Sequence, residues 1–250
     1  SNNSFDIGLD FSLLSNRVNG SIEYFQKESS NLLFSVPLPL SSGVLSRLEN
    51  VGTLSNSGVE LHVSADVLKS SDFNWNVDFN WTTLKNEFKK LPAGQDEIIN
   101  DTKKIMVGRS IYDYWLRQWY GVDPADGAAL YLAENLEASS NRVIDGVTVT
   151  TDINNAKYDY SGSAIPDFYG GITNSLSYKD LSLSFLLTYQ VGGKIYDNTY
   201  AALMQAKVEG RALHEDMLKR WQKPGDITDV PRLDNGQAAN FNAANSSRWL

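Results

Sequence analysis

Residues 168–190, FYGGITNSLSYKDLSLSFLLTYQ, carry the pattern that decides the fold. From Leu181 to Gln190 every second residue is apolar, and four of the five residues between them are polar. Such a period of two is typical of a β-strand with one apolar and one polar face. The preceding run from Gly170 to Tyr178 alternates more weakly, and only Lys179 and Asp180 separate the two runs. This spacing predicts a tight hairpin.

The same alternation occurs in two earlier parts of the chain, which predicts two further hairpins. The strand that begins at Phe73 is the most asymmetric, because aromatic rings and Val77 occupy one face while three asparagines and Asp78 occupy the other. We therefore predict an all-β antiparallel structure with six long strands. The predicted strands cover residues 4–14, 17–27, 57–67, 73–84, 168–178 and 181–190.

Long segments alternate with the short turns: residues 28–56, 85–167 and 191–250 are predicted to be loops. Loops of this length are uncommon in compact soluble domains. Short turns at one end and long loops at the other are typical of outer-membrane β-barrels, and the strand length suits a tilted crossing of the bilayer. A soluble β-sandwich would show the same alternation, so it remains an alternative.

The composition excludes several classes of protein. Apolar residues make up 42% and charged residues 21%, which argues against disorder. No apolar run reaches the roughly 18 residues that predict a transmembrane helix, and a net charge of −8 argues against a nucleic-acid partner. Carboxylates on the polar strand faces favour a wide, hydrated lumen. They are Asp6, Asp10, Glu23, Glu60, Asp66 and Asp78.

The third long segment contains one predicted helix. Apolar residues at helical spacing within Ala201–Trp221 precede the stop signal Lys223-Pro224-Gly225.

Nothing in the sequence indicates an enzyme. His62 and His214 are the two histidines, the chain has no cysteine, and no spacing of metal ligands or of a catalytic triad is present. The sequence DPADG at 123–127 lacks the later ligand positions of a calcium loop, so a turn is the favoured interpretation. We expect no catalytic residue, no metal and no cofactor.

The aromatic residues divide into a strand group and a loop group. Strand aromatics, together with apolar neighbours, are predicted to face lipid or to lie in the interfacial girdles. The predicted lipid-facing residues are Phe73, Trp75, Val77, Phe79, Trp81, Leu181, Leu183, Phe185 and Leu187. Loop aromatics beside polar residues suit sugar binding, whereas packing of the loop itself or of a partner protein is the alternative. The candidate ligand-binding residues are Tyr112, Tyr114, Trp115, Trp119, Tyr120 and Tyr131.

Five segments, in order, resemble the SusC/RagA family of TonB-dependent outer-membrane transporters of Bacteroidetes. They are Glu49–Leu61 (ENVGTLSNSGVEL), 108–127 (GRSIYDYWLRQWYGVDPADG), Ile165–Tyr178 (IPDFYGGITNSLSY), Leu181–Asp197 and Trp221–Arg232 (WQKPGDITDVPR). The resemblance implies an internal fragment from the later part of a barrel of roughly 22 strands. It also implies that residues 1–250 contain no plug domain.

The resemblance further implies a multi-pass barrel in the outer membrane of a Gram-negative bacterium. Its expected function is the uptake of glycan oligosaccharides or oligopeptides with a SusD-like surface lipoprotein. TonB would act through an N-terminal part that this chain lacks, and the rest of the barrel and the lipid bilayer are further partners. A passive porin-like channel and a soluble cell-surface β-sandwich that binds carbohydrate are the alternatives.

Overall fold

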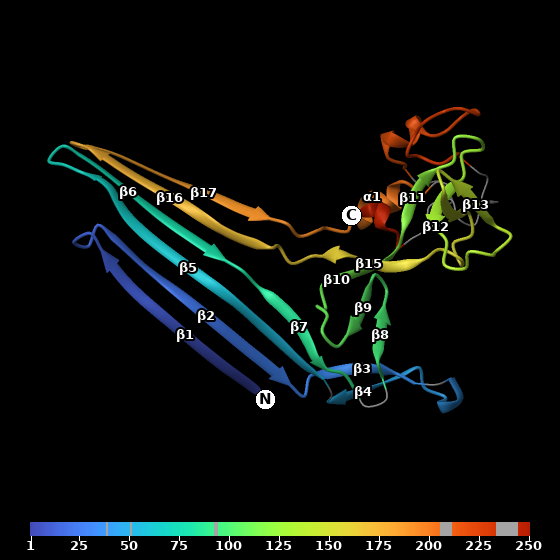
Figure 1. The fold of residues 1–250 in the computed structure, drawn as a ribbon, viewed down its shortest axis with the longest axis horizontal. Coiled ribbons are helices and arrows are strands. Elements are labelled where there is room, and N and C mark those ends of the chain that lie inside the picture. Colours follow the sequence, from blue (N-terminus) through green and yellow to red (C-terminus); the bar gives the residue numbers. More distant parts are fainter. Residues whose placement is uncertain (39, 51, 93–94, 206–211, 234–244) are drawn as a thin grey trace. The chain divides into compact units, whose positions relative to one another are not determined.

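A computed structural model describes residues 1–38, 40–50, 52–92, 95–205, 212–233 and 245–250 (Figure 1). Its strands form four separate sheets, and the largest contains all six of the long strands. Among the described residues, no helix is both long and apolar enough to cross a membrane.

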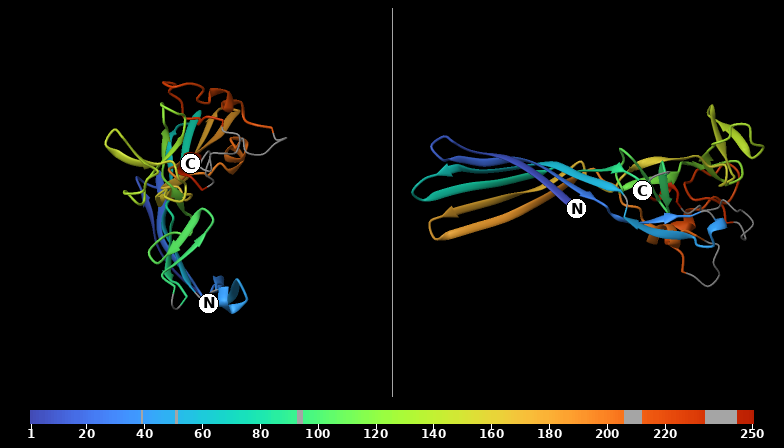
Figure 2. Two further views of the ribbon diagram at one scale, coloured as in Figure 1. Left: turned by 90° about the vertical axis from the view of Figure 1, so that its right-hand side faces the viewer. Right: turned by 90° about the horizontal axis from the view of Figure 1, so that it is seen from below.

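The largest sheet has the strand order β1-β2-β5-β6-β16-β17, and β7 pairs with β5 beside this path. The three predicted hairpins are the antiparallel pairs β1–β2, β5–β6 and β16–β17. Two views show these strands lying side by side along their length (Figure 1, Figure 2). Their bounds are β1 (Asn2–Leu13), β2 (Val18–Ser30), β5 (Thr53–Lys69), β6 (Phe73–Thr82), β7 (Lys85–Lys90), β16 (Phe168–Tyr178) and β17 (Leu181–Val191).

The register joins the apolar sides of the six strands into one continuous face. Because direct partners across a sheet share a face, a single row can be followed from β1 to β17. That row consists of Leu9, Ile22, Leu61, Trp81, Gly170 and Tyr189. The next apolar row contains Phe79 and Leu187. The single row between these two contains His62 and Asn80 and belongs to the polar face.

A β-bulge interrupts this register near the turn of the β5–β6 hairpin. Asp66 pairs with Asn76, but the next partner of β6 is Leu68, opposite Trp75. Val67 is therefore the extra residue, and strict alternation fails at this point. Continued alternation from Val59 would place Val67 on the apolar face, whereas the bulge gives that position to Leu68.

Three glycines on these strands lie directly opposite aromatic residues: Gly20 opposite Phe11, Gly58 opposite Phe25, and Gly170 opposite Tyr189. In each pair the ring lies over the glycine. A Cβ atom at Gly170 would come within 2.0 Å of the Asn80 carbonyl oxygen and 2.6 Å of the Tyr189 hydroxyl. The absence of a side chain therefore allows the ring and the neighbouring backbone to approach.

The segments predicted to be long loops contain many short strands, so that part of the prediction is wrong. Most of them have four to six residues, which is too short for a period of two to be recognised, and β12 is buried almost throughout. They form sheets of order β15-β10-β9-β8, β11-β12-β14-β13 and β3-β4. Their bounds are β3 (Leu33–Pro37), β4 (Ser46–Asn50), β8 (Glu97–Asn100), β9 (Lys103–Met106), β10 (Asp113–Arg117), β11 (Trp119–Val122), β12 (Ala129–Leu132), β13 (Asn141–Ile144), β14 (Val147–Thr150) and β15 (Tyr158–Ser163).

The predicted helix Ala201–Trp221 is also wrong in extent. The α-helix α1 covers Asn198–Leu203, and residues 212–214 are not helical. Residues 206–211 of the prediction, like Val51 of the motif at Glu49–Leu61, lie outside the described residues. The helix is replaced near its predicted end by the 3-10 helix η2 (Glu215–Lys219), because the His214 ring accepts a hydrogen bond from the Asp216 amide and caps a new start. Two shorter 3-10 helices are η1 (Leu40–Ser42) and η3 (Ser247–Trp249).

The chain divides into two compact units. The strand unit comprises Ser1–Ile99, Lys104–Asp113 and Ser163–Lys194, and the loop unit comprises Asn100–Lys103, Tyr114–Gly162 and Ile195–Leu250. A small core around Phe88, Leu91 and Ile98 belongs to the strand unit. The loop unit has its own cores, one around Tyr131 and one around Met204 and Trp249.

The close approach at Gly170 predicts a strong effect of one added methyl group. Gly170→Ala should destabilise the full-length protein by roughly 1–3 kcal/mol, because the new Cβ overlaps the β6 backbone. The neighbouring Gly171→Ala is the matched control, since the tightest contact of its Cβ would be with the Leu186 side chain at 3.2 Å, which can move, and the nearest backbone atom, the Leu187 carbonyl oxygen, would lie at an ordinary contact distance of 3.5 Å. Urea unfolding of both variants measures the difference. Equal stability of the two variants would contradict the inferred packing.

Candidate functional site

The polar face of the large sheet carries a network of hydrogen bonds across β5 and β6. The Asp78 carboxylate lies 2.5 Å from the His62 ring and accepts a hydrogen bond from Ser64 at 3.0 Å. Asp66 accepts hydrogen bonds from the Asn76 amide at 3.1 Å and from Lys69 at 3.3 Å. These carboxylates are therefore held by neighbouring side chains on the same face of the sheet. In the part of the chain that the structure describes, no group of acidic, histidine or cysteine side chains could hold a metal ion.

The apolar face is largely exposed in this chain. Leu181 is 73% exposed and Leu183 60% exposed, and both belong to a face that runs across six strands. All nine residues that the sequence predicts to face lipid lie on this face by register. An exposed apolar surface of this extent is typical of a site of contact with a membrane or with another protein.

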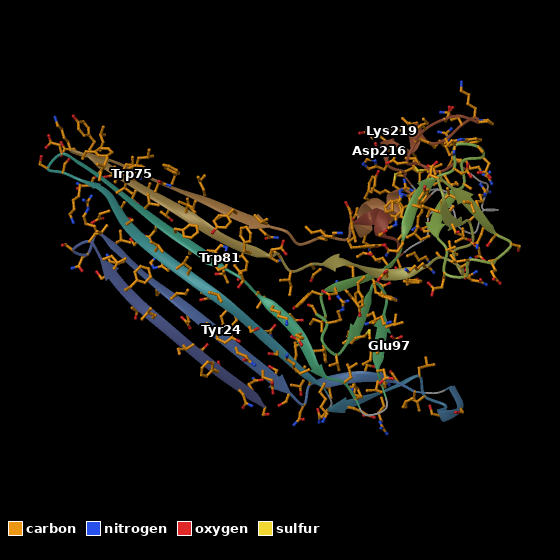
Figure 3. All side chains as sticks on the ribbon, viewed as in Figure 1. Tyr24, Trp75, Trp81, Glu97, Asp216 and Lys219 are labelled. Carbon is orange, nitrogen blue, oxygen red and sulfur yellow. The ribbon has the colours of Figure 1, made fainter. Side chains whose placement is uncertain are left out.

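Aromatic rings gather at both ends of the apolar face on β6, β16 and β17. At the end away from the hairpin turn, the Tyr189 ring stacks on Phe79 at 6.2 Å and meets Phe168 at 6.3 Å, while Trp81 lies 6.2 Å from Phe168. Figure 3 shows Trp75 and Trp81 well separated along β6. The Trp75 indole donates a hydrogen bond to Asn174 at 3.2 Å, which satisfies a polar side chain on the apolar face.

A half-buried aromatic surface lies in the loop unit, on β10 and β15. Trp115 and Arg117 alternate on β10 with Tyr114 and Leu116, which are 8% and 0% exposed and face the interior. From β15, Tyr158 lies nearly parallel to Trp115 with ring centroids 6.2 Å apart, and Tyr160 meets Trp115 edge-on at 4.9 Å. The Arg117 guanidinium lies 4.8 Å from the centre of the Tyr158 ring. We call Trp115, Arg117, Tyr158 and Tyr160 the aromatic surface.

The six candidate ligand-binding aromatics do not form one site. Only Trp115 belongs to the aromatic surface, and Tyr112 is an exposed residue of the strand unit. Tyr131 is 1% exposed and, like Tyr114, packs in the interior. Trp119 packs edge-on against Tyr131 at 5.4 Å, and the Tyr120 hydroxyl donates a hydrogen bond to the Ile144 carbonyl at 3.4 Å.

The sequence interpretation missed Arg117, Tyr158 and Tyr160. The signal was the alternation Tyr158-Asp159-Tyr160, which places two rings on one face of a short strand.

Arginine side chains hold the acidic turn at 123–127. Arg142 donates hydrogen bonds to Asp123 at 2.6 Å and to both oxygens of Asp126 at 2.9 Å. This guanidinium lowers the pKa of Asp126, and the carboxylates in turn raise the pKa of Arg142. The two carboxylates are therefore used within the fold as a structural turn.

A tryptophan ring packs on the same turn. Gly127 has a φ of +73°, and a Cβ there would lie 2.5 Å from the Trp221 ring. The Trp221 indole donates a hydrogen bond to the Pro124 carbonyl at 2.9 Å. Two of the family-like segments, 108–127 and Trp221–Arg232, thus pack against each other within the loop unit. We call this contact the Trp221–Gly127 contact.

The strand unit contains a polar cavity of about 440 Å³. Its lining comes from the β6–β7 corner, from residues 108–113 and from residues 163–167. Asn86 is 5% exposed and holds the wall of the cavity together. Its side-chain oxygen, Oδ1, accepts hydrogen bonds from the Ser110 hydroxyl at 2.9 Å and the Ile111 backbone amide at 3.1 Å. Its amide group donates to Asn56 at 2.7 Å. The lining residues are Thr83, Leu84, Lys85, Asn86, Gly108, Arg109, Ser110, Asp113, Ser163, Ile165, Pro166 and Asp167.

Several known proteins resemble this chain in sequence. A family model described as TonB dependent receptor-like, beta-barrel, matches residues 1–191. TonB-dependent receptor P3 of Formosa agariphila is 30% identical over 241 residues, which cover 91% of this chain and 24% of that receptor. TonB-dependent receptor SusC of Bacteroides thetaiotaomicron is 27% identical over 196 residues, 77% of this chain and 19% of that receptor. The chain thus spans about a quarter or less of the length of these relatives.

Solved structures give the same picture for the fold. A structure of the RagAB peptide transporter matches with a TM-score of 0.81 and 23% identity, covering 99% of this chain and 27% of the matched one. The RagAB peptide importer in its open-open state matches with a TM-score of 0.72 and 23% identity, covering 97% of this chain and 26% of the matched one.

The arginine clamp on the acidic turn predicts a pH-dependent stability. Because the folded-state pKa of Asp126 is lowered, its contribution is complete above about pH 4, the usual pKa of an aspartate, and is lost as the pH falls through the lowered value. Arg142→Gln should therefore cost about 1 kcal/mol at pH 7 and much less at pH 2. Thermal unfolding at both pH values measures this. Arg47→Gln, which removes an exposed pair with Glu49, is the control and should have little effect at either pH.

Proposed function

Because the chain belongs to the TonB-dependent receptor-like β-barrel family, we propose that its six long strands form part of the wall of an active importer of the SusC/RagA type. Members of this family are transporters rather than enzymes, and their barrels lie in the outer membrane of Gram-negative bacteria. The fold is that of part of such a barrel, which argues against the soluble β-sandwich.

The observation that carries the proposal is the pair of opposite faces on one sheet. The apolar face would contact lipid, and the polar face with its Asp78 and Asp66 network would line the lumen. Strand β16 has eleven residues. At a rise of about 3.3 Å per residue and a tilt of about 40°, such a strand spans roughly 25 Å, the height of the apolar band of outer-membrane barrels. Aromatic residues at both strand ends fit interfacial girdles.

The proposed cargo is an oligosaccharide or an oligopeptide, captured with a SusD-like surface lipoprotein. Similarity to SusC of Bacteroides thetaiotaomicron and to the RagAB peptide importer supports an importer of this type. Energy would reach the barrel from TonB through parts of the full-length transporter other than the segment described by these 250 residues. The short turns, including Lys179-Asp180, would face the periplasm, and the loop unit would lie outside the cell.

Within the loop unit, the aromatic surface is a better candidate for ligand contact than the six aromatic residues that the sequence predicts. Trp115, Tyr158 and Tyr160 offer half-exposed rings on a rigid strand pair, and Arg117 adds a donor beside them. Sugar C–H faces stack on such rings while hydroxyls take polar partners. Tyr114 and Tyr131 are left out of this proposal because both are buried.

A charge placed on either face tests the wall assignment. Phe185→Arg in the full-length protein should prevent assembly, because an arginine facing lipid near the bilayer midplane costs about 2–4 kcal/mol. Its sequence neighbour Ser184 lies on the other face, so Ser184→Arg should be tolerated. The amount of folded barrel in outer-membrane fractions measures the outcome. Similar yields from the two variants would refute the assignment of lipid to the apolar face.

Energy dependence separates an importer from a passive porin. Cells that carry the full-length gene should take up a fluorescent oligosaccharide or oligopeptide substrate, and a protonophore should reduce uptake to the level of a gene-deletion strain. A passive channel would continue to equilibrate the same compound after the proton-motive force has collapsed. The deletion strain, with and without protonophore, is the control.

A further inference from the structure

We propose that the polar cavity of the strand unit binds one or two sugar residues of a neutral oligosaccharide. The inference deepens the import function proposed above and rests on it for its biological meaning. It concerns a different place from the aromatic surface, and it names one of the two cargo classes.

The cavity forms where the large sheet divides. Strand β6 pairs with both β5 and β16 as far as Thr82, which lies opposite Tyr169. Beyond this point β7 pairs only with β5 in the large sheet, so β7 and the start of β16 are no longer neighbours. The segments 108–113 and 163–167 line the resulting space. A volume of about 440 Å³ lies within the usual range for small-molecule sites, roughly 300–1,000 Å³.

The wall of the cavity is fixed before any ligand arrives. Asn86 uses both ends of its side chain, holding Ser110, Ile111 and Asn56 at 2.7–3.1 Å. The Phe88 amide donates to the Arg109 carbonyl at 2.9 Å, which ties the same segment to β7. Gly192 has a φ of +73°, and a Cβ there would lie 2.4 Å from a carboxylate oxygen of Asp167, so the glycine leaves room for that carboxylate. Preorganisation of this kind reduces the entropy cost of binding.

The side chains around the cavity match the chemistry of a sugar. A hydroxyl both donates and accepts hydrogen bonds, and the cavity is lined by carboxylate acceptors at Asp113 and Asp167 and by the cationic residues Arg109 and Lys85. The Lys85 ammonium is also ion-paired with Glu87 at 2.8 Å, which fixes its position and leaves its other N–H groups as donors. Two carboxylates and two cations balance, so the lining has no net preference for an anion or a cation. Ile165 and Pro166 supply apolar surface for C–H groups. A neutral, polyhydroxylated ligand fits this set.

The position of Asn86 also places the cavity on the side of the sheet where cargo would pass. Asn86 hydrogen-bonds Asn56, its direct partner on β5. Along β5, Asn56 has the same parity as Glu60, His62 and Ser64, which belong to the polar face. The cavity wall therefore continues the face proposed to line the lumen.

Calorimetric titration of the purified full-length protein in detergent tests the inference. The probes are cellohexaose, xylohexaose, mannohexaose and maltohexaose, with a capped, uncharged hexapeptide as the competing class. At least one hexasaccharide should bind, and the double variant Asp113→Asn, Asp167→Asn should weaken that binding at least tenfold. Asp180→Asn, an exposed carboxylate in the β16–β17 turn, should leave it unchanged. Should the double variant not fold, Asp167→Asn alone, at an exposed side chain, provides the same comparison.

Three results would overturn the inference: no hexasaccharide binds, the Asp113 and Asp167 changes leave saccharide affinity intact, or the hexapeptide binds with the same sensitivity to these changes. Binding in detergent needs neither TonB nor an energised membrane. Intact binding without energised uptake would therefore count against the importer proposal alone, and energised uptake without cavity binding would count against this inference alone.

Discussion

Hydrogen bonding of the backbone between neighbouring strands is the constraint on which the rest of this structure depends. In a lipid phase each main-chain N–H and C=O needs a partner within the protein, and a sheet supplies these partners only when its strands keep register. Register in turn decides which side chains share a face, because a slip of one residue exchanges the two faces of a strand. The rows that join Leu9 to Tyr189 across six strands are therefore the feature from which both the apolar and the polar surface follow.

The sheet keeps this register over long strands with several local devices. Glycines opposite Phe11, Phe25 and Tyr189 make room for rings that would otherwise push neighbouring strands apart. The bulge at Val67 shifts the register by one residue, and because Leu68 then lies opposite Trp75 the row stays apolar across the shift. On the apolar face the side-chain oxygen of Asn174 accepts a hydrogen bond from the Trp75 indole. The glycines and the indole each remove a packing or hydrogen-bonding conflict, and the bulge changes the register without interrupting the apolar face.

The sequence predicted the long strands well, and the reason is physical. An alternation over about ten residues is statistically clear, and it has one cause, a sheet with two different surroundings. The short strands of the loop unit have no such signal, because four residues such as those of β12 are buried on both faces and their pairing depends on distant segments. The helix prediction over Ala201–Trp221 failed because apolar spacing cannot reveal a competing cap such as His214. Among the candidate site residues, Trp115 could be found from composition, whereas Tyr131 could not be told from a core residue without its neighbours. The cavity around Asn86 could not be predicted at all, since its wall joins three segments that are far apart in the chain.

The Trp221–Gly127 contact has a consequence for how such a loop unit can evolve. Gly127 has no room for a side chain while the Trp221 indole is present. If the glycine is replaced, the indole can no longer pack on the turn. The two positions, separated by more than ninety residues of sequence, must therefore change together or not at all. The residues between them are not bound by this rule. Outside β16 and β17, whose register is fixed by the large sheet, lineages can lengthen, shorten or rewrite the intervening segments of the loop unit to suit a new cargo, while the paired positions keep the contact between its two ends.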